Sequence, residues 1–534
     1  MPVQAEQSNE MEGSKLQDNV NRRICNGDDI GTVKFVGEVA PAAGIWLGVE
    51  WDDPQRGKHD GSRNGIQYFK CSHPSGGSFL RPNKADFGRD IVSAFKEKYI
   101  PNDMETGDID ETIMSLGSRT IEMVGAQKIA TRQSSFNNLT EVSLRNERIS
   151  IAGETSLQAP NVNGLNISKN LVSSWEELSK ITRQLKKLQR LDISENRLVI
   201  PSEPATLLPH FSSLQELLLN RVSISWEELL DCAVMWPLLK KLVVCFNHLS
   251  PLKREPKTCL QELELLNLEG NDISSWDEVL TVGRLPKLQT LILNANKLPD
   301  ICFDDASPRE RTRYFPQLKY ISLNHNEITE WTSMSELNKL ENLEELFFKC
   351  NPLTKEVPQS DVRGKLIAKL RKLKKFNNSM VLRGERRGAE IDYLKQNCKE
   401  WLESGGSRDA NNSQPSEAFV TSHPTYEKLL EIYGAPEESE TVVEAKDLKS
   451  TLIEVFITCP QDPSKKQLKK KLPAAMELQK LKSLVQKIYK IAVCEQKLVY
   501  TRKEKDGYEI EMDNDQRPIG FFGIEFGDTI LVKY

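Results

Sequence analysis

The chain has 534 residues, which is enough for two to four folded domains at roughly one domain per 150 residues. Hydrophobic residues make up 38% and charged residues 28%, as in soluble globular proteins. The net charge of -5 is small for this length, so the overall charge does not indicate nucleic-acid binding. No apolar run approaches the roughly 20 residues that span a bilayer, so no membrane anchor is indicated.

The first segment, residues 1–22, is a polar tail without the apolar stretch of a secretory signal, so we expect a cytoplasmic protein. The ten cysteines are scattered without C-x-x-C pairs or nearby histidine clusters, which predicts free thiols, no metal and no cofactor. No Ser/His/Asp order, catalytic cysteine signature or phosphate-binding loop stands out. We therefore expect that the chain is not an enzyme.

Residues 23–95 have a different sequence pattern, in which short β-type runs alternate with glycines. This pattern predicts a small glycine-rich β-barrel. Its loop Gly57-Lys58-His59-Asp60-Gly61 offers an ammonium group, a ring N–H and backbone N–H groups that glycines leave accessible. Such donors suit a carboxylate, particularly that of a free chain terminus.

The segment resembles a CAP-Gly domain. The resemblance rests on Gly31, Val33, Phe35, Gly37, Gly44, Trp46, Gly48, the loop 57–61, Gly65, Tyr68, Phe69, Cys71, Gly77, Phe79 and Arg81. It implies a groove for acidic C-terminal tails that end in an aromatic residue, as that of α-tubulin does. The residues implied to bind the tail are Phe35, Trp46, Gly57, Lys58, His59, Asp60, Gly61, Phe69, Phe79 and Arg81.

Two positions depart from the family pattern, because His59 replaces the usual asparagine and Pro41 stands where an aromatic residue is common. Histidine has an ordinary pKa of about 6.5, against about 4.3 for glutamate, so mild acid would charge the ring while the tail stays anionic. We therefore hypothesise that His59 makes tail binding pH-sensitive. The alternative is a solvated loop residue.

Residues 96–138 are interpreted as a linker and the N-terminal cap of a solenoid, and residues 139–362 as leucine-rich repeats. The template L-x-x-L-x-L-x-x-N-x-L starts at 139, 162, 188, 214, 239, 263, 288, 318 and 343, which gives nine repeats. The asparagines should form a buried ladder that bonds neighbouring backbone groups, and Glu147 and Val222 should interrupt it.

Four repeats continue into Ser- or Thr-containing segments before Trp175, Trp226, Trp276 and Trp331, which predicts helix starts on the convex side and packing roles for these tryptophans. Strand alternation directs other positions to the concave face. Large apolar residues there predict a partner-binding patch, with shielding by another part of the chain as the alternative. The patch residues are Val243, Phe246, Ile292, Tyr320 and Phe347.

Residues 363–434 read as C-terminal cap helices, helical over 364–396 and 424–434, with a polar loop at 404–416. An acidic linker follows at 435–449. The pattern of residues 450–534, a strand, a basic hairpin, a helix and further strands, resembles a ubiquitin-like β-grasp. Its lysines are either a patch for acidic partners or a solvated hairpin. The whole is thus predicted as a multidomain α+β chain.

This order of domains resembles the tubulin-folding cofactor family. The resemblance implies a chaperone that binds α-tubulin and the αβ-tubulin dimer, assembles or dissociates that dimer with cofactors B, C and D, and is cytoplasmic and associated with the cytoskeleton. The ubiquitin-like domain would reach a further partner such as the proteasome. The alternative is a CAP-Gly adaptor that decorates microtubules and links tubulin tails to ubiquitin or proteasome partners. Neither nucleic acid nor membrane is an expected partner.

Overall fold

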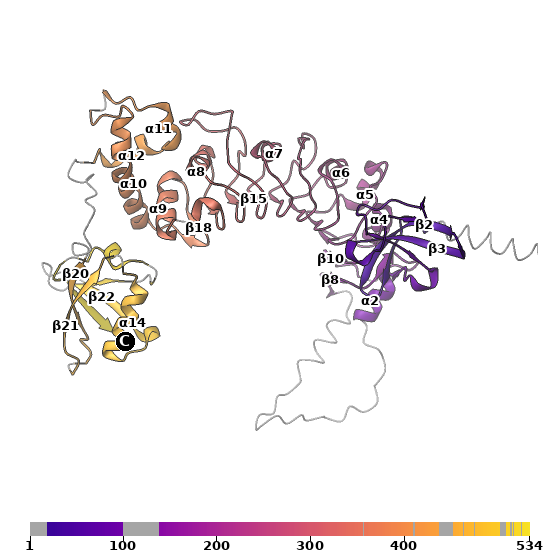
Figure 1. Cartoon of the computed structure of the whole chain (residues 1–534), viewed down its shortest axis with the longest axis horizontal. Coiled ribbons are helices and arrows are strands. Elements are labelled where there is room, and N and C mark those ends of the chain that lie inside the picture. Colours follow the sequence, from indigo (N-terminus) through magenta and orange to yellow (C-terminus); the bar gives the residue numbers. More distant parts are fainter. Residues whose placement is uncertain are drawn as a thin grey trace, which may run out of the picture. The chain divides into compact units, whose positions relative to one another are not determined.

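The computed structural model describes residues 19–99, 138–157, 159–355, 357–409, 412–436, 452–462, 464–474, 476–501, 509–512, 515, 517–524 and 526–534. Most of the predicted tail, of the 96–138 linker and of the acidic linker lies outside these ranges. The N-terminal module and the solenoid belong to one compact unit, and the ubiquitin-like module belongs to a second (Figure 1). Within the described ranges, no helix combines the length and the apolar character that crossing a membrane requires.

The N-terminal module is built on an antiparallel sheet with the strand order β1-β2-β3-β6. Alternate residues of these strands bury a small core that includes Ile24, Val33, Leu47, Val49 and Trp51. The elements are β1 Arg23–Asn26, β2 Asp29–Val39, β3 Ala42–Trp51, β4 Ser62–Arg63, β5 Ile66–Gln67, β6 Gly77–Leu80, β7 Arg89–Asp90 and α2 Ile91–Tyr99.

The solenoid contains one strand for each of the nine predicted repeats, and all nine run parallel. They are β8 Glu141–Ser143, β10 Gly164–Asn166, β11 Arg190–Asp192, β12 Glu216–Leu218, β13 Lys241–Val243, β14 Leu265–Asn267, β15 Thr290–Ile292, β16 Tyr320–Ser322 and β17 Glu345–Phe347. The central residue of each strand, such as Leu217 or Leu291, is buried, while its two neighbours face the other side. The prediction of nine repeats is confirmed.

The asparagine ladder is present and is interrupted at Val222. The side-chain oxygen of Asn196 accepts a bond from the Asn170 N–H at 3.2 Å, and that of Asn271 accepts one from the Asn247 N–H at 2.8 Å. The Asn196 N–H instead donates to the carbonyl of Ile193, because Val222 offers no acceptor in the next repeat. Each rung thus depends on an amide side chain in the following repeat.

Short helices lie on the opposite side of the solenoid from the sheet (Figure 1). They are α4 Trp175–Thr182, α5 Leu208–Phe211, α6 Trp226–Cys232, α7 Trp276–Leu280 and α8 Trp331–Glu336. Ser174, Ser225 and Ser275 cap their helices as predicted. Helix α8 also begins at its tryptophan as predicted, but its N-cap is Glu330, which makes no capping side-chain bond. Trp331 is only half-buried, and the Lys365 ammonium lies 5.2 Å from its ring centroid.

The C-terminal cap differs from the continuous helical pattern that the sequence predicted over 364–396. Helix α9 (Gln359–Lys369) ends before a hairpin of β18 (Lys375–Phe376) and β19 (Ser379–Met380), and β18 extends the solenoid sheet beside β17. Asn377 and Asn378 form the turn with positive φ of 46° and 69°, a conformation that asparagine tolerates. Three further helices are α10 Arg383–Glu403, α11 Glu417–Ser422 and α12 Tyr426–Tyr433.

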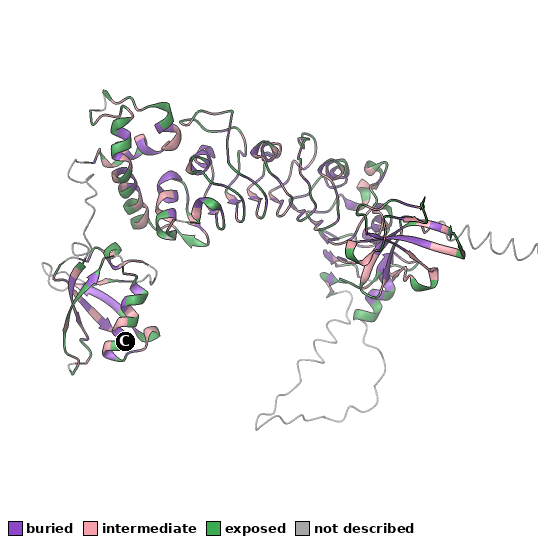
Figure 2. Cartoon of the chain, in the orientation of Figure 1, coloured by how far each residue is buried: buried purple, intermediate pink, exposed green. Residues whose placement is uncertain are grey.

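The ubiquitin-like module has a five-stranded sheet with the order β21-β20-β24-β22-β23, and its helix α14 shares the core with the inner face of the sheet. Val455, Ile457 and Leu498 of the sheet are fully buried with Leu481 and Val485 of α14, and the central strands appear as buried in Figure 2. The predicted β-grasp is confirmed. Its elements are β20 Leu452–Thr458, β21 Leu468–Pro473, α14 Leu478–Tyr489, β22 Lys497–Thr501, β23 Glu509–Glu511 and β24 Thr529–Lys533.

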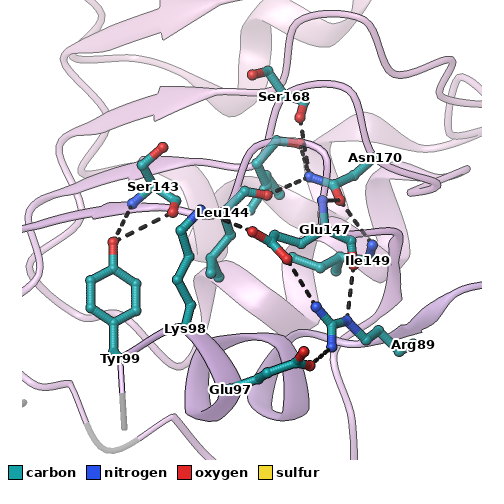
Figure 3. A network of polar contacts seen from close by, with 11 residues as sticks. Arg89, Glu97, Lys98, Tyr99, Ser143, Leu144, Glu147, Ile149, Ser168 and Asn170 are labelled. Atoms are coloured by element: carbon teal, nitrogen blue, oxygen red, sulfur yellow. Dashed lines mark hydrogen bonds and ion pairs between the residues drawn. The ribbon is translucent and has the colours of Figure 1, made fainter. Parts of the chain in front are cut away.

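The N-terminal module is joined to the first repeat around Glu147 (Figure 3). Arg89 of β7 donates to the Glu147 carboxylate at 2.9 Å and to its carbonyl at 3.0 Å, and Lys98 donates to the other carboxylate oxygen at 2.9 Å. The Asn170 side-chain oxygen accepts bonds from the N–H groups of Glu147 and Ile149. The first rung of the ladder therefore holds the turn that presents Glu147 to the N-terminal module.

A second contact closes the N-terminal edge of the solenoid sheet. The hydroxyl of Tyr99, at the end of α2, accepts a bond from the Ser143 N–H at 3.0 Å and donates to the Ser143 carbonyl at 3.4 Å (Figure 3). Strand β9 (Ile149–Ile151) also pairs with β7 in parallel. Because β8 is an edge strand of the solenoid sheet, the end of α2 covers part of this edge, whereas most of the range 96–138 in which the cap was predicted lies outside the described residues.

We predict that Asn170→Ala destabilises the solenoid by about 3 kcal/mol, because it leaves the N–H groups of Glu147 and Ile149 without their acceptor and the Leu144 carbonyl without its donor. Urea unfolding followed by circular dichroism measures this change. Asn342→Ala, which removes one exposed bond to the Pro316 carbonyl, is the control and should cost less than about 1 kcal/mol. Equal effects of the two substitutions would show that the ladder is not stabilising.

Candidate functional site

An aromatic cluster covers the face of the N-terminal sheet opposite its apolar core. Phe35 of β2 lies opposite Gly48 of β3, which in turn lies opposite Phe79 of β6. Tyr68 and Phe69, which follow β5, pack against these residues. The ring centroids of Tyr68 are 5.3 Å from Phe35 and 5.4 Å from Phe79, and those of Phe69 and Phe79 are 5.6 Å apart. The structure thus brings Phe35, Phe69 and Phe79 together as predicted.

Tyr68 was not among the predicted site residues, although its ring packs between those of Phe35 and Phe79. Its hydroxyl accepts a bond from the Ala40 N–H at 3.2 Å, at the turn between β2 and β3. Gly48 makes room for the neighbouring ring, since a Cβ atom there would lie 2.5 Å from a ring carbon of Phe69. The adjacency of Tyr68 to Phe69 in the sequence was the available signal.

The glycine loop 57–61 is bound to the start of β6. The N–H groups of Lys58 and His59 both donate to the Gly77 carbonyl, at 2.7 and 3.2 Å, and the Gly77 N–H donates to the His59 carbonyl at 2.7 Å. A Cβ atom on Gly57 would collide with the Ser75 carbonyl, so glycine is needed here for close packing. The expectation that this loop offers free backbone N–H groups to a carboxylate is therefore wrong for residues 58 and 59.

His59 lies against the aromatic cluster, with its ring centroid 4.8 Å from that of Phe79. Its Nδ1 accepts a bond from the Gly61 N–H at 3.0 Å, which requires the neutral tautomer that carries its proton on Nε2. Burial lowers the pKa of His59 below its usual value, Arg63 acts in the same direction, and the Asp60 carboxylate opposes them. The ring therefore offers one neutral N–H donor at physiological pH.

Lys58 and Asp60 have different surroundings although they flank the same histidine. No hydrogen bond or ion pair joins the exposed Lys58 ammonium to any residue that the structure describes. The Asp60 carboxylate accepts bonds from the Ser62 hydroxyl and N–H, which lower the pKa of Asp60. Lys58 is thus available to an anion, whereas Asp60 shapes the turn.

Trp46 and Arg81 form a neighbouring pair on the same sheet face. Trp46 lies opposite Gly37, and the Arg81 guanidinium carbon is 3.7 Å from the Trp46 ring centroid. Arg81 also donates to the carbonyls of Ala43 and Ile45, at 2.8 and 3.2 Å. Arg81 therefore holds the edge of the sheet and covers one side of Trp46.

The solvent-facing side of the solenoid sheet carries half-buried apolar side chains in two adjacent rows, which are formed by the first and the third residues of strands β12 to β17. Tyr320 and Phe347 contact each other, with ring centroids 5.2 Å apart. Leu218 and Leu265 occupy the same template positions as the predicted patch residues, but they were not among the residues predicted. We define the sheet-face patch as Leu218, Val243, Leu265, Ile292, Tyr320 and Phe347.

Charged side chains flank the sheet-face patch and neutralise one another. Arg190 lies 3.3 Å from Glu216, and Lys241 lies 3.7 Å from the other carboxylate oxygen of Glu216. On the other side, Lys375 lies 3.4 Å from Glu345. Ion-paired charges thus lie toward the two ends of the sheet face, while its middle carries Leu265, Ile292 and Tyr320 among the uncharged polar residues Asn267, Thr290 and Ser322.

Phe246 lies outside these rows, contrary to the prediction. The backbone turns after β13 and reaches Phe246 at a positive φ of 57°. Its ring rests against Gly270, and the Arg221 guanidinium carbon is 4.6 Å from the ring centroid. The ring lines an open cavity of about 560 Å³ that also includes Trp51 and Arg56 of the N-terminal module.

The fold and this arrangement define a protein with a CAP-Gly module, a leucine-rich-repeat solenoid and a ubiquitin-like module. The CAP-Gly domain family model matches residues 19–85. The chain is 42% identical over 525 residues to tubulin-specific chaperone E of Danio rerio and 40% identical over 521 residues to that of Mus musculus, and each alignment covers 97% of this chain and 99% of the relative. The chain therefore belongs to the tubulin-specific chaperone E family.

A solved structure with a similar module is the C-terminal ubiquitin-like domain of mouse tubulin-specific chaperone E. It is 34% identical and covers 17% of this chain and 94% of that domain, with a TM-score of 0.16.

We predict that the pKa of His59 lies below its ordinary value of about 6.5. Because burial depresses the folded-state pKa, His59 contributes stability that is fully present above the unfolded-state pKa and is lost as the pH falls toward the folded-state pKa. NMR titration of the histidine rings measures the pKa, and His59→Asn is the control that should remove this part of the pH dependence. A pKa at or above 6.5 would restore the hypothesis of charging in mild acid.

Proposed function

We propose that this chain is a non-catalytic, cytoplasmic chaperone that binds α-tubulin and promotes assembly and dissociation of the αβ-tubulin dimer. The proposal rests first on membership of a family whose curated relatives are named tubulin-specific chaperones. The structural observation that carries it is the unpaired ammonium of Lys58, which is adjacent in sequence to His59, whose ring packs on a cluster of four aromatic rings. Cofactors B, C and D are the proposed partner proteins in dimer assembly and dissociation.

The CAP-Gly module is the proposed binding site for the acidic C-terminal tail. The Lys58 ammonium and the Nε2–H donor of His59 would meet carboxylates of the tail, since both are donors and neither has a described acceptor on this chain. Phe35, Tyr68 and Phe79 would contact an aromatic terminal residue. Arg81 and Trp46 would extend this surface, with Gly57, Asp60, Gly61 and Phe69 supporting its shape.

The sheet-face patch is the proposed contact for the folded body of the client. Its aromatic members, Tyr320 and Phe347, are the residue types that contribute most to protein interfaces. The self-paired charges around the patch would form the polar rim. Phe246 is not part of this surface, because it faces the cavity beside the CAP-Gly module.

Two contacts on one chain strengthen each other. Once the tail is bound, the body of the same subunit stays at high effective concentration near the sheet face, and avidity can exceed either single affinity by roughly 10²-fold or more. The ubiquitin-like module would recruit a further partner, and the proteasome is one candidate. The alternative function is a microtubule adaptor, which would need only the CAP-Gly site.

We predict that Lys58→Ala weakens binding of a peptide that ends in Glu-Glu-Tyr by about ten-fold, because it removes a charge-assisted contact. Fluorescence anisotropy of the labelled peptide measures the affinity. Lys84→Ala is the matched control, because Lys84 is an exposed cation of the same module at the end of a 3-10 helix. A similar loss in both variants would mean that only the general charge of the module attracts the tail.

We predict that Tyr320→Ser combined with Phe347→Ser abolishes the avidity for native αβ-tubulin while peptide affinity is unchanged. The expected weakening is about 10²-fold, to the level of tail binding alone. The control combines Val234→Ser and Leu238→Ser, which also alter exposed apolar residues, 41% and 52% exposed, but away from the strands of the sheet. Unchanged tubulin binding together with a loss of solenoid stability would identify Tyr320 and Phe347 as packing residues.

A further inference from the structure

The ubiquitin-like module has an open sheet edge at β21. This strand pairs antiparallel with β20 over the six residues Leu468–Pro473. In the part of the chain that the structure describes, β20 is the sole strand paired with it. The outer side of β21 therefore presents backbone N–H and C=O groups that a further strand can accept.

Three consecutive lysines, Lys469, Lys470 and Lys471, occupy this edge and are all exposed. Strand alternation places Lys469 and Lys471 on one face and Lys470 on the other. The carboxylate of Glu454 lies 2.6 Å from the Lys469 ammonium and 3.9 Å from that of Lys471. One carboxylate thus serves two lysines, so positive charge remains in excess along the edge.

The neighbouring surface adds an apolar contact. Phe456 of β20 is half-buried and lies opposite Lys469, whose ammonium is 5.9 Å from the Phe456 ring centroid. Val455 and Ile457 point into the core, so Phe456 faces away from α14. Lys466 and Lys470 have no ion pair with a carboxylate among the described residues. The edge therefore combines an excess of positive charge, including the unpaired Lys466 and Lys470, with one apolar side chain, Phe456.

We propose that β21 binds an acidic segment of a partner protein in extended conformation, which adds to the sheet as a sixth strand. Backbone hydrogen bonds would hold the segment. Lys469 and Lys471, which share the single Glu454 carboxylate, would select acidic side chains on one face of it, and the unpaired Lys470 would attract them on the other. The same lysines repel a second copy of β21, so they prevent self-pairing while they attract an acidic strand. This site needs neither a free chain end nor an aromatic residue, so it is independent of the CAP-Gly site.

The test uses the full chain and a fluorescein-labelled peptide of alternating glutamate and valine with an amidated C-terminus. This peptide lacks the free aromatic terminus that the CAP-Gly module is proposed to bind. Lys469→Glu with Lys471→Glu reverses two charges on the strand, and Lys480→Glu with Lys487→Glu makes the same change in charge on exposed positions of α14. Lys469→Gln with Lys471→Gln is the milder variant if the first pair unfolds the module.

We expect saturable binding that the strand substitutions weaken by about ten-fold and the α14 substitutions by less than about two-fold. A peptide with an N-methyl group on every residue keeps its charge but has no backbone N–H on either edge, so it should bind at least about ten-fold more weakly. Absence of binding, equal loss in both charge variants, or equal binding of the methylated peptide would overturn the proposal. So would a dimer of the chain that the strand substitutions dissociate, because β21 would then pair with itself.

Discussion

The side-chain amide of Asn170 is the contact on which the arrangement of the N-terminal half depends. It is fully buried, donates to three carbonyls and accepts from the N–H groups of Glu147 and Ile149. A buried backbone group without a partner costs about 1–3 kcal/mol, so this one side chain satisfies a large local requirement. The turn that it holds presents Glu147 to Arg89 and Lys98, and thereby connects the repeats to the CAP-Gly module.

The same principle, that backbone groups must be satisfied, explains the glycine loop of the CAP-Gly module. Its N–H groups at Lys58 and His59 are used by Gly77, and that at Gly61 is used by the His59 ring. With these N–H groups occupied, the groups that remain for a ligand include the Lys58 ammonium, one imidazole N–H and the aromatic rings. Replacement of asparagine by histidine in this loop keeps a neutral donor and adds a ring that packs on Phe79.

The sequence predicted those features that repeat or that depend on composition. Leucine spacing predicted nine strands with buried centres, and the substitution at Val222 predicted where the ladder is interrupted. The β18–β19 hairpin was missed because the surrounding residues have helical spacing, and only the asparagine pair at 377 and 378 indicated a turn. The location of Phe246 was missed because strand alternation was extended to the eighth template position. That position has a positive φ in each of the nine repeats, which moves the Phe246 ring off the sheet face.

The candidate site was predictable as a set of residues but not as a set of contacts. The aromatic residues of the CAP-Gly segment were identified, whereas Tyr68 was omitted because its role depends on bonds to Ala40 and on packing between two other rings. The contact of Tyr99 with the edge strand β8 was likewise not predicted, since its partner Ser143 lies 44 residues away in the sequence. Pairing between distant segments is what the sequence pattern cannot specify.

The central claim is that the tail site and the sheet-face patch act together on one tubulin subunit. The most direct measurement mixes the full chain with native αβ-tubulin, with and without cofactor B, and resolves the products by native electrophoresis with subunit-specific detection. The account predicts α-tubulin separated from β-tubulin and retained on this chain or on the cofactor. An intact dimer held only through its tail would contradict it and would identify the chain as a recognition adaptor.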